Sequence, residues 1–223
     1  ADVLNISAPG AGDADVKDSL GYLKIITFNG PEVLGPVKSA LRDFPEIGGL
    51  VVDLRDNRGG RLREARLASL DIAKALEALQ PRQQQNPQAA TLGLLVTSNT
   101  ASASELMVTQ LRGQGLQSSA LVISCGEDPP STRTYGKSEE QEAIDLSDGG
   151  ALLLTTSRWG PEGFKGVPAD VLCSPFGVPR WAGTALAPRG FRRLDIASAR
   201  GKFSTEEEDG CVQCAAEAML AMR

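Results

Sequence analysis

Residues 92–105 read Leu-Gly-Leu-Leu-Val-Thr-Ser-Asn-Thr-Ala-Ser-Ala-Ser-Glu, the pattern of a strand that turns directly into a helix. The apolar run at 92–96 is typical of a strand covered on both faces. Residues 98–102 form the turn, and the apolar spacing from 103 to 111 predicts the helix. Because a strand followed by a helix is the repeating unit of α/β folds, this stretch indicates a layered fold with a parallel sheet.

The same alternation extends along most of the chain. Further strands are predicted at residues 23–28, 50–54, 121–124 and 151–157, and further helices at residues 31–44 and 62–79. A hairpin-type turn, Asp148-Gly149-Gly150, precedes the last of these strands. The order predicts an α/β layered fold with a mostly parallel sheet flanked by helices.

The chain is expected to divide into three segments. Residues 1–19 are rich in Gly, Ala and Asp and are expected to form an irregular N-terminal arm. Residues 20–172 hold the predicted sheet and its helices. Residues 173–223 are expected to form an irregular C-terminal extension that ends in a helix. The capping box of that helix would combine Ser204 or Thr205 with Glu207 or Glu208.

The composition argues against several classes of protein. Of the 223 residues 41% are hydrophobic, enough for a sizeable core, and the net charge is −5. No basic face is evident, so no nucleic-acid partner is expected. The longest apolar runs, at 92–96 and 151–154, fall far short of the roughly 20 residues that span a bilayer and are short enough to be buried strands. The chain begins at Ala1 with no targeting segment, so a processed or trimmed form is expected.

The cysteines allow more than one interpretation. Cys125, Cys173, Cys211 and Cys214 are too few for a disulfide scaffold at this length. Cys211 and Cys214 have C-x-x-C spacing, which fits a redox disulfide. Two unrelated thiols on one helix face are the simpler interpretation. A metal site would need further Cys or His ligands nearby, and the chain contains no histidine.

Ser102 and Lys137 are the residues best suited to catalysis. A serine hydroxyl is a weak nucleophile until a base removes its proton. Histidine usually acts as that base, but the chain contains none, so a lysine is the best base available. A buried position would suit this role, because burial disfavours the charged form of lysine and lowers its pKa.

Two turns fall at the carboxyl ends of predicted parallel strands, where α/β proteins build their sites. One turn carries Gly59 and Gly60, and the other carries Ser102 and Ala103. Backbone N–H groups from both turns would hold a developing oxyanion, typically at ~3–4 kcal/mol per donor. Taken alone, each part has a structural explanation as a helix cap, a turn or a solvated cation. Their order and framing favour a catalytic site.

Five blocks of sequence together resemble the carboxyl-terminal processing (tail-specific) protease family. The blocks are Asp-Leu-Arg-Asp-Asn-Arg-Gly-Gly at 53–60, Leu-Leu-Val-Thr-Ser-Asn-Thr-Ala-Ser-Ala-Ser-Glu at 94–105, Tyr-Gly-Lys at 135–137 with Gln141, Leu-Ser-Asp-Gly-Gly-Ala-Leu-Leu-Leu-Thr at 146–155, and Gly-Val-Pro-Ala-Asp-Val at 166–171. The resemblance covers residues 20–171. It implies that residues 20–172 form a catalytic core of the crotonase-like or ClpP-like type.

The resemblance also implies a role for each site residue. Ser102 would be the nucleophile, Lys137 the general base and Gln141 the residue that supports the lysine. The oxyanion hole would combine the N–H of Ala103 with that of one glycine of the Gly59–Gly60 pair. No metal and no organic cofactor is implied.

The family cleaves proteins near their carboxyl termini, so the substrate implied is a protein C-terminal tail. One branch of the family trims the D1 protein of photosystem II. By analogy with the family, the expected compartment is the thylakoid lumen of a chloroplast or a bacterial periplasm.

The sequence also departs from the family, which leaves alternatives open. We expect no counterpart of the family's PDZ domain within these 223 residues. Arg58 replaces the usual proline, and Glu139-Glu140 follow closely after the lysine, where acids favour its protonated form. A second interpretation is therefore a catalytically degenerate protease-like subunit that serves as a structural or assembly component of a larger complex, such as a photosynthetic membrane complex. A third is an active core whose substrate-recruiting domain lies on a partner chain.

Overall fold

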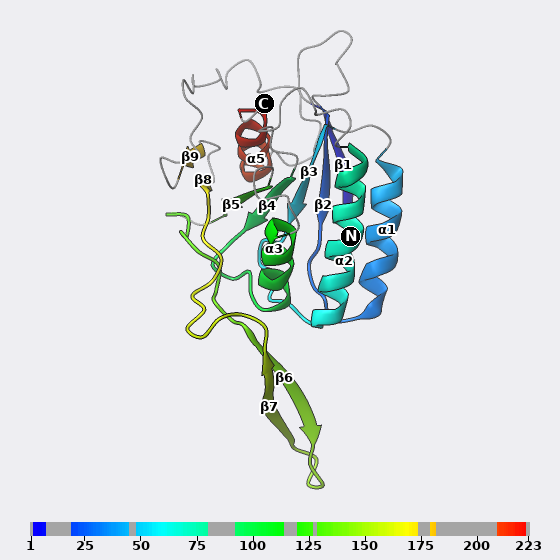
Figure 1. Cartoon of the computed structure of the whole chain (residues 1–223), viewed down its shortest axis with the longest axis vertical. Helices are drawn as coiled ribbons and strands as arrows, with labels where there is room; N and C mark the ends of the chain where they lie inside the picture. The colour runs from blue at the N-terminus through cyan, green and yellow to red at the C-terminus, as the bar shows by residue number, and fades with distance from the viewer. Residues whose placement is uncertain are drawn as a thin grey trace.

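The computed structural model describes residues 2–7, 19–44, 48–79, 92–113, 120–126, 129–173, 179–181 and 209–221. In this part of the chain, a seven-stranded sheet has the order β1-β2-β3-β4-β5-β8-β9 (Figure 1). A separate two-stranded sheet pairs β6 with β7. The predicted α/β fold with a mostly parallel sheet is confirmed.

Five neighbouring strands of the large sheet run parallel. They are β2 (Ser19–Lys24), β3 (Gly49–Asp53), β4 (Leu92–Val96), β5 (Ala120–Ser124) and β8 (Val171–Cys173). The antiparallel strands β1 (Asp2–Ser7) and β9 (Pro179–Trp181) form its two edges. Because the central strands β3, β4 and β5 are buried along their whole length, their sequences are nearly continuous apolar runs.

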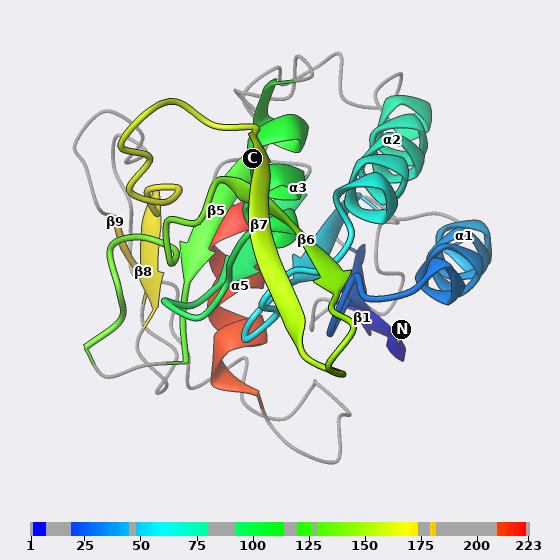
Figure 2. The same cartoon turned by 90° about the horizontal axis from the view of Figure 1, so that it is seen from below.

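Helices cover both faces of the sheet (Figure 2). On one face, a short 3-10 helix (Pro31–Val33), α1 (Leu34–Asp43), α2 (Leu62–Leu79) and α3 (Ala103–Gly113) enclose the larger core. On the other face, α5 (Gly210–Leu220) packs over a second core that includes Tyr22, Leu95 and Met219. Among the described helices, none is both long and apolar enough to cross a membrane.

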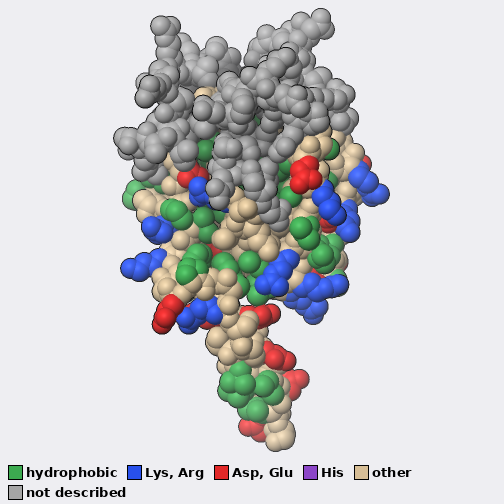
Figure 3. All heavy atoms as spheres, viewed as in Figure 1, with side chains coloured by type: hydrophobic (Ala, Val, Ile, Leu, Met, Phe, Trp, Pro, Cys, Tyr) green, Lys and Arg blue, Asp and Glu red, His purple; other side chains and the backbone are tan. Residues whose placement is uncertain are grey.

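A hairpin formed by β6 (Glu139–Asp145) and β7 (Ala151–Arg158) projects from the body of the protein (Figure 1). The apolar run at 151–154 is therefore not a buried strand, since all residues of β7 are exposed. Directly opposed residues share a face of a hairpin, so one face carries three exposed large hydrophobic side chains: Ile144, Leu152 and Leu154. Hydrophobic and acidic side chains gather on the projecting hairpin (Figure 3).

Replacing Leu153 on the opposite face of the hairpin is expected to have almost no effect on stability. Leu153 pairs with Ala143 and is 64% exposed, so Leu153→Ser is expected to change the free energy of unfolding by less than about 0.5 kcal/mol. Leu94→Ala in the core is expected to cost about 2–5 kcal/mol, because Leu94 is fully buried. Urea unfolding of the two variants measures both values. A large loss in Leu153→Ser would show that the hairpin packs on the body.

The two ends of the chain differ from expectation. Residues 2–7 are not an irregular arm, because they form β1 and pair with β2 along its whole length. The last helix is capped by Asp209 rather than by Ser204 or Thr205, which lie outside the described residues. The Asp209 carboxylate accepts hydrogen bonds from the N–H groups of Cys211 and Val212, so the helix begins at Gly210.

The cysteines are all paired, contrary to both interpretations of the C-x-x-C motif. Cys211 is bonded to Cys125 at the end of β5, and Cys214 is bonded to Cys173 in β8. Cys211 and Cys214 lie close together on α5 but are bonded to different strands, because α5 lies near the carboxyl ends of both β5 and β8. The two disulfides therefore fasten α5 to the sheet.

Candidate active site

The site is built where three parallel strands end and their turns meet. Past β2, the Phe28 N–H and C=O pair with the Gly59 C=O and the Arg61 N–H, both at 2.9 Å. Past β3 and β4, the Ala101 N–H donates to the Asn57 carbonyl at 3.1 Å. A Cβ atom on Gly59 would lie 2.9 Å from the Ser102 Cβ. The predicted meeting of the glycine turn and the serine turn is therefore present.

Ser102 occupies a strained turn immediately before α3. Its φ of 56° lies in the left-handed region, which non-glycine residues rarely adopt. Such strain costs on the order of 1–3 kcal/mol and clusters at active sites. The side chain is nearly buried, and the following residue, Ala103, begins the helix. Ser102 therefore lies in the turn between β4 and α3, and a strained strand-to-helix turn is where α/β-hydrolases expose their nucleophile.

Glu105 holds the serine turn and the lysine loop together. The side chain is fully buried. One carboxylate oxygen, Oε2, accepts the Ser102 N–H at 2.8 Å and the Lys137 N–H at 2.9 Å. The other, Oε1, accepts the Thr134 hydroxyl at 2.5 Å and the Gly136 N–H at 2.7 Å. Because charge-assisted hydrogen bonds are the stronger ones, this carboxylate fixes the loop at residues 134–137 beside Ser102.

Lys137 contacts Gln141, the residue that the family resemblance assigns to support it. The Lys137 Nζ donates to Gln141 Oε1 at 2.8 Å, rather than to Ser102 Oγ, and this bond is exposed to solvent. Lys137 is half-buried and its partner Gln141 belongs to the projecting hairpin, so the burial expected of a lysine base is incomplete. The two neighbouring acids point elsewhere: Glu139 pairs with Arg158 at 3.5 Å, and Glu140 accepts the Ser157 hydroxyl at 2.6 Å.

The three candidate oxyanion donors differ in availability. The Gly59 N–H donates to Asn57 Oδ1 at 2.9 Å. The N–H groups of Gly60 and Ala103 have no acceptor within the part of the chain that is described. Arg58, which replaces the family's usual proline directly before Gly59, is exposed. Gly60 and Ala103 are therefore the free donors.

Comparison with known proteins matches residues 19–165 to Peptidase family S41. The chain belongs to peptidase family S41. The chain is 30% identical over 213 residues to the chloroplastic C-terminal processing peptidase of Tetradesmus obliquus, covering 84% of this chain and 44% of that protein. It is 32% identical over 164 residues to a carboxyl-terminal-processing protease of Synechocystis sp. (strain ATCC 27184 / PCC 6803 / Kazusa), covering 66% and 35%.

A solved structure supports the fold of this S41 chain. The photosystem II D1 C-terminal processing protease superposes with a TM-score of 0.52 at 22% identity, covering 80% of this chain and 49% of that one. The S41 chain spans less than half the length of each of these three proteins.

The candidate site also depends on Glu105, a residue outside the predicted catalytic set. The spacing Ser102-x-x-Glu105 is that of a capping box, which predicts the bond from Glu105 to the Ser102 N–H. No local pattern predicts the three donors from residues 134–137, because they come from a distant loop.

In the described residues, no group of three or more His, Cys, Asp or Glu side chains is placed to hold a metal ion.

Proposed function

We propose that this chain is a serine endopeptidase of the carboxyl-terminal processing type, which cleaves protein C-terminal tails with Ser102 and Lys137. One observation carries the proposal: the N–H groups of Ser102 and Lys137 lie within 2.9 Å of the same Glu105 oxygen. A nucleophile and a lysine are thereby held on adjacent backbone in a chain without histidine. Residues 20–172 are the proposed catalytic core.

In the proposed mechanism, Ser102 Oγ attacks the carbonyl carbon of the scissile peptide bond while neutral Lys137 takes the hydroxyl proton. The oxyanion that forms accepts hydrogen bonds from the N–H groups of Ala103 and Gly60. Lys137 then gives its proton to the departing amine, which leaves an acyl-enzyme. Water, deprotonated by Lys137, attacks the ester carbonyl and breaks the bond to Ser102 Oγ. Lys137 returns the proton to Ser102 Oγ, which releases the new carboxyl terminus and restores the serine hydroxyl and the neutral lysine.

Gln141 is proposed to orient the lysine. Its Oε1 accepts a hydrogen bond from the Lys137 Nζ and so fixes one end of a flexible side chain. A substrate strand lying over the site would exclude water from this pair. The lysine would then meet the desolvation that a neutral base requires.

The proposed compartment and substrates follow from relatives. Two matched proteins are named as chloroplastic processing peptidases, in Tetradesmus obliquus and Arabidopsis thaliana. The thylakoid lumen is therefore the proposed compartment, with a bacterial periplasm as the counterpart. The carboxyl-terminal tail of a lumenal or membrane-bound protein is the proposed substrate.

Cleavage of peptide tails, followed by mass spectrometry, tests the function. Wild type is expected to release one defined C-terminal fragment, and Ser102→Ala is expected to lose at least about 1,000-fold in rate. Ser104→Ala is a matched control two residues away, since the buried Ser104 hydroxyl has no hydrogen-bond partner among the described residues. Equal cleavage by wild type and Ser102→Ala would contradict the proposal.

A further inference from the structure

The C-terminal helix α5 is covalently linked to the large sheet. Its two disulfides fasten it to β5 and β8, and its buried side chains, among them Ala215 and Met219, pack on the face of the sheet opposite α3. Asp209, the cap of this helix, lies outside residues 19–165, which match the family.

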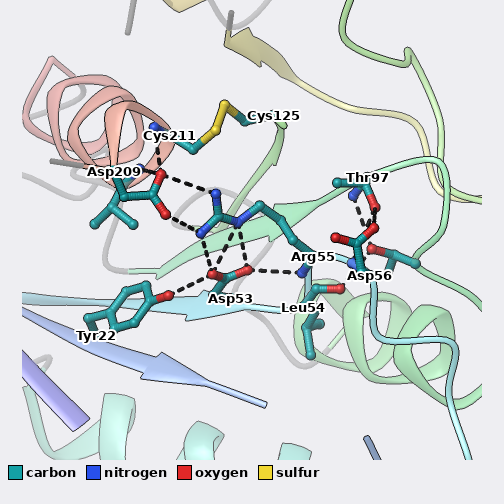
Figure 4. A network of polar contacts seen from close by, with 11 residues as sticks. Tyr22, Asp53, Leu54, Arg55, Asp56, Thr97, Cys125, Asp209 and Cys211 are labelled. Carbon is teal, nitrogen blue, oxygen red and sulfur yellow. Dashed lines mark hydrogen bonds and ion pairs between the residues drawn. A yellow bond between two sulfur atoms is a disulfide. The ribbon is translucent and has the colours of Figure 1, made fainter. Parts of the chain in front are cut away.

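Asp209 forms an ion pair with Arg55, which lies two residues after the end of the buried strand β3. Arg55 lies between two carboxylates (Figure 4). It donates to Asp209 at 2.5 and 3.1 Å and to Asp53 at 2.6 to 3.1 Å. Asp53 is fully buried and also accepts the Tyr22 hydroxyl at 2.6 Å. Burial alone would raise the pKa of the Asp209 carboxyl, but its bonds with Arg55 outweigh burial and lower that pKa.

Arg55 is the first residue of the turn at residues 55–60, which carries the oxyanion donor Gly60. The next residue, Asp56, has a φ of 60°, and strained backbone persists only where its surroundings hold it. On one side the Arg55 N–H and guanidinium are bound to Asp53. On the other side the Asp56 N–H and Oδ1 contact the Thr97 hydroxyl, both at 3.3 Å. One step further, the Asn57 carbonyl accepts the Ala101 N–H, one residue before Ser102.

We propose that Asp209 is a positioning residue for the reaction: through Arg55 it fixes the turn at residues 55–60 and so the oxyanion donors beside Ser102. The inference rests on the proposed function. Asp209 touches no reacting atom, and its effect reaches the site through Arg55 and the strained Asp56. The C-terminal helix thereby completes an active site whose other parts lie within the family match.

The test compares Asp209→Asn with Glu217→Gln. Asparagine caps a helix as well as aspartate does, and both disulfides stay, so Asp209→Asn removes the negative charge that faces Arg55 and little else. Glu217 is an acid of the same helix that contacts Gln213 and not Arg55. Asp209→Asn is expected to slow fluorophosphonate labelling of Ser102 and to lower kcat about 10- to 100-fold, with KM little changed, while Glu217→Gln behaves as wild type.

Hydrogen exchange at residues 54–60 separates this inference from the proposed function. The amides of this turn are expected to exchange faster in Asp209→Asn than in wild type or Glu217→Gln. Faster exchange in a protein whose wild type is never labelled would leave the positioning intact and reject the peptidase. Unchanged exchange would overturn the positioning, whatever the labelling rate. Asp209→Ser, a second neutral cap, guards against a folding defect peculiar to asparagine.

The pH dependence of thermal stability tests the ion pair between Asp209 and Arg55 independently. Because the pKa of Asp209 is lowered on folding, its ion pair stabilises the protein above the unfolded pKa. That stabilisation is lost as pH falls through the folded pKa. Wild type is thus expected to have a higher Tm than Asp209→Asn at neutral pH, with the gap closing in acid. A gap that does not depend on pH would contradict the ion pair.

Discussion

Glu105→Gln is expected to lower the free energy of unfolding by about 3–5 kcal/mol and to abolish labelling of Ser102. The Glu105 carboxylate accepts four hydrogen bonds. A buried donor that loses its acceptor destabilises the protein by the full cost of its desolvation. Glutamine keeps one acceptor oxygen but turns an NH₂ group toward the remaining donors. The loop at residues 134–137 then separates from the serine turn, and Lys137 moves with it.

Urea unfolding and fluorophosphonate labelling measure the two effects of Glu105→Gln. Glu77→Gln is the control, because Glu77 is an exposed glutamate in α2 and its replacement is expected to change neither value. If Glu105→Gln kept wild-type stability and labelling, Glu105 would not be the residue that joins nucleophile and base.

Gly59→Ala is expected to reduce Ser102 labelling at least about 100-fold, the effect of losing an oxyanion donor. A Cβ on Gly59 would lie 2.8 Å from the Ala101 carbonyl oxygen, 2.9 Å from the Ala103 nitrogen and 2.9 Å from the Ser102 Cβ. Backbone on both turns would have to move apart, since no flexible side chain can yield. The two turns would then separate, and the free N–H groups of Gly60 and Ala103 would no longer point at one oxyanion.

Gly163→Ala is the matched control for the strain in Gly59→Ala. Both glycines have positive φ, 99° at Gly59 and 69° at Gly163, but a Cβ on Gly163 would meet nothing within 4 Å. Both variants are expected to lose about 1 kcal/mol or more of stability from the backbone alone. A loss of labelling in both to the same degree would attribute the effect to instability and not to contact with Ser102.

The sequence predicts the centre of the fold well because its signals there are local. The strand at Leu92–Val96 and the helix at Leu62–Leu79 have the predicted bounds, since buried parallel strands are continuous apolar runs and helices repeat every 3.6 residues. β2 lies four residues earlier than predicted. Residues 25–28 look like a strand but leave the ladder to contact the glycine turn, where Phe28 bridges Gly60.

What the sequence does not predict depends on contacts between distant residues. Local spacing places Cys211 near Cys214 on one helix, yet each is bonded to a strand far away in the chain. The apolar run at 151–154 has the composition of a buried strand, but its burial depends on what packs against it. The candidate site follows the same rule: the serine turn is local, whereas the position of Lys137 depends on Glu105.

Intact-mass analysis after fluorophosphonate treatment tests the central claim, a Ser102–Lys137 dyad, most directly. Wild type is expected to gain one adduct, located on Ser102 by peptide mapping. Ser102→Ala is expected to gain none, and Lys137→Ala to react at least about 100-fold more slowly, the usual contribution of a general base. A folded wild type without adduct from about pH 6 to about pH 10, or an adduct that persists in Ser102→Ala, would contradict the dyad.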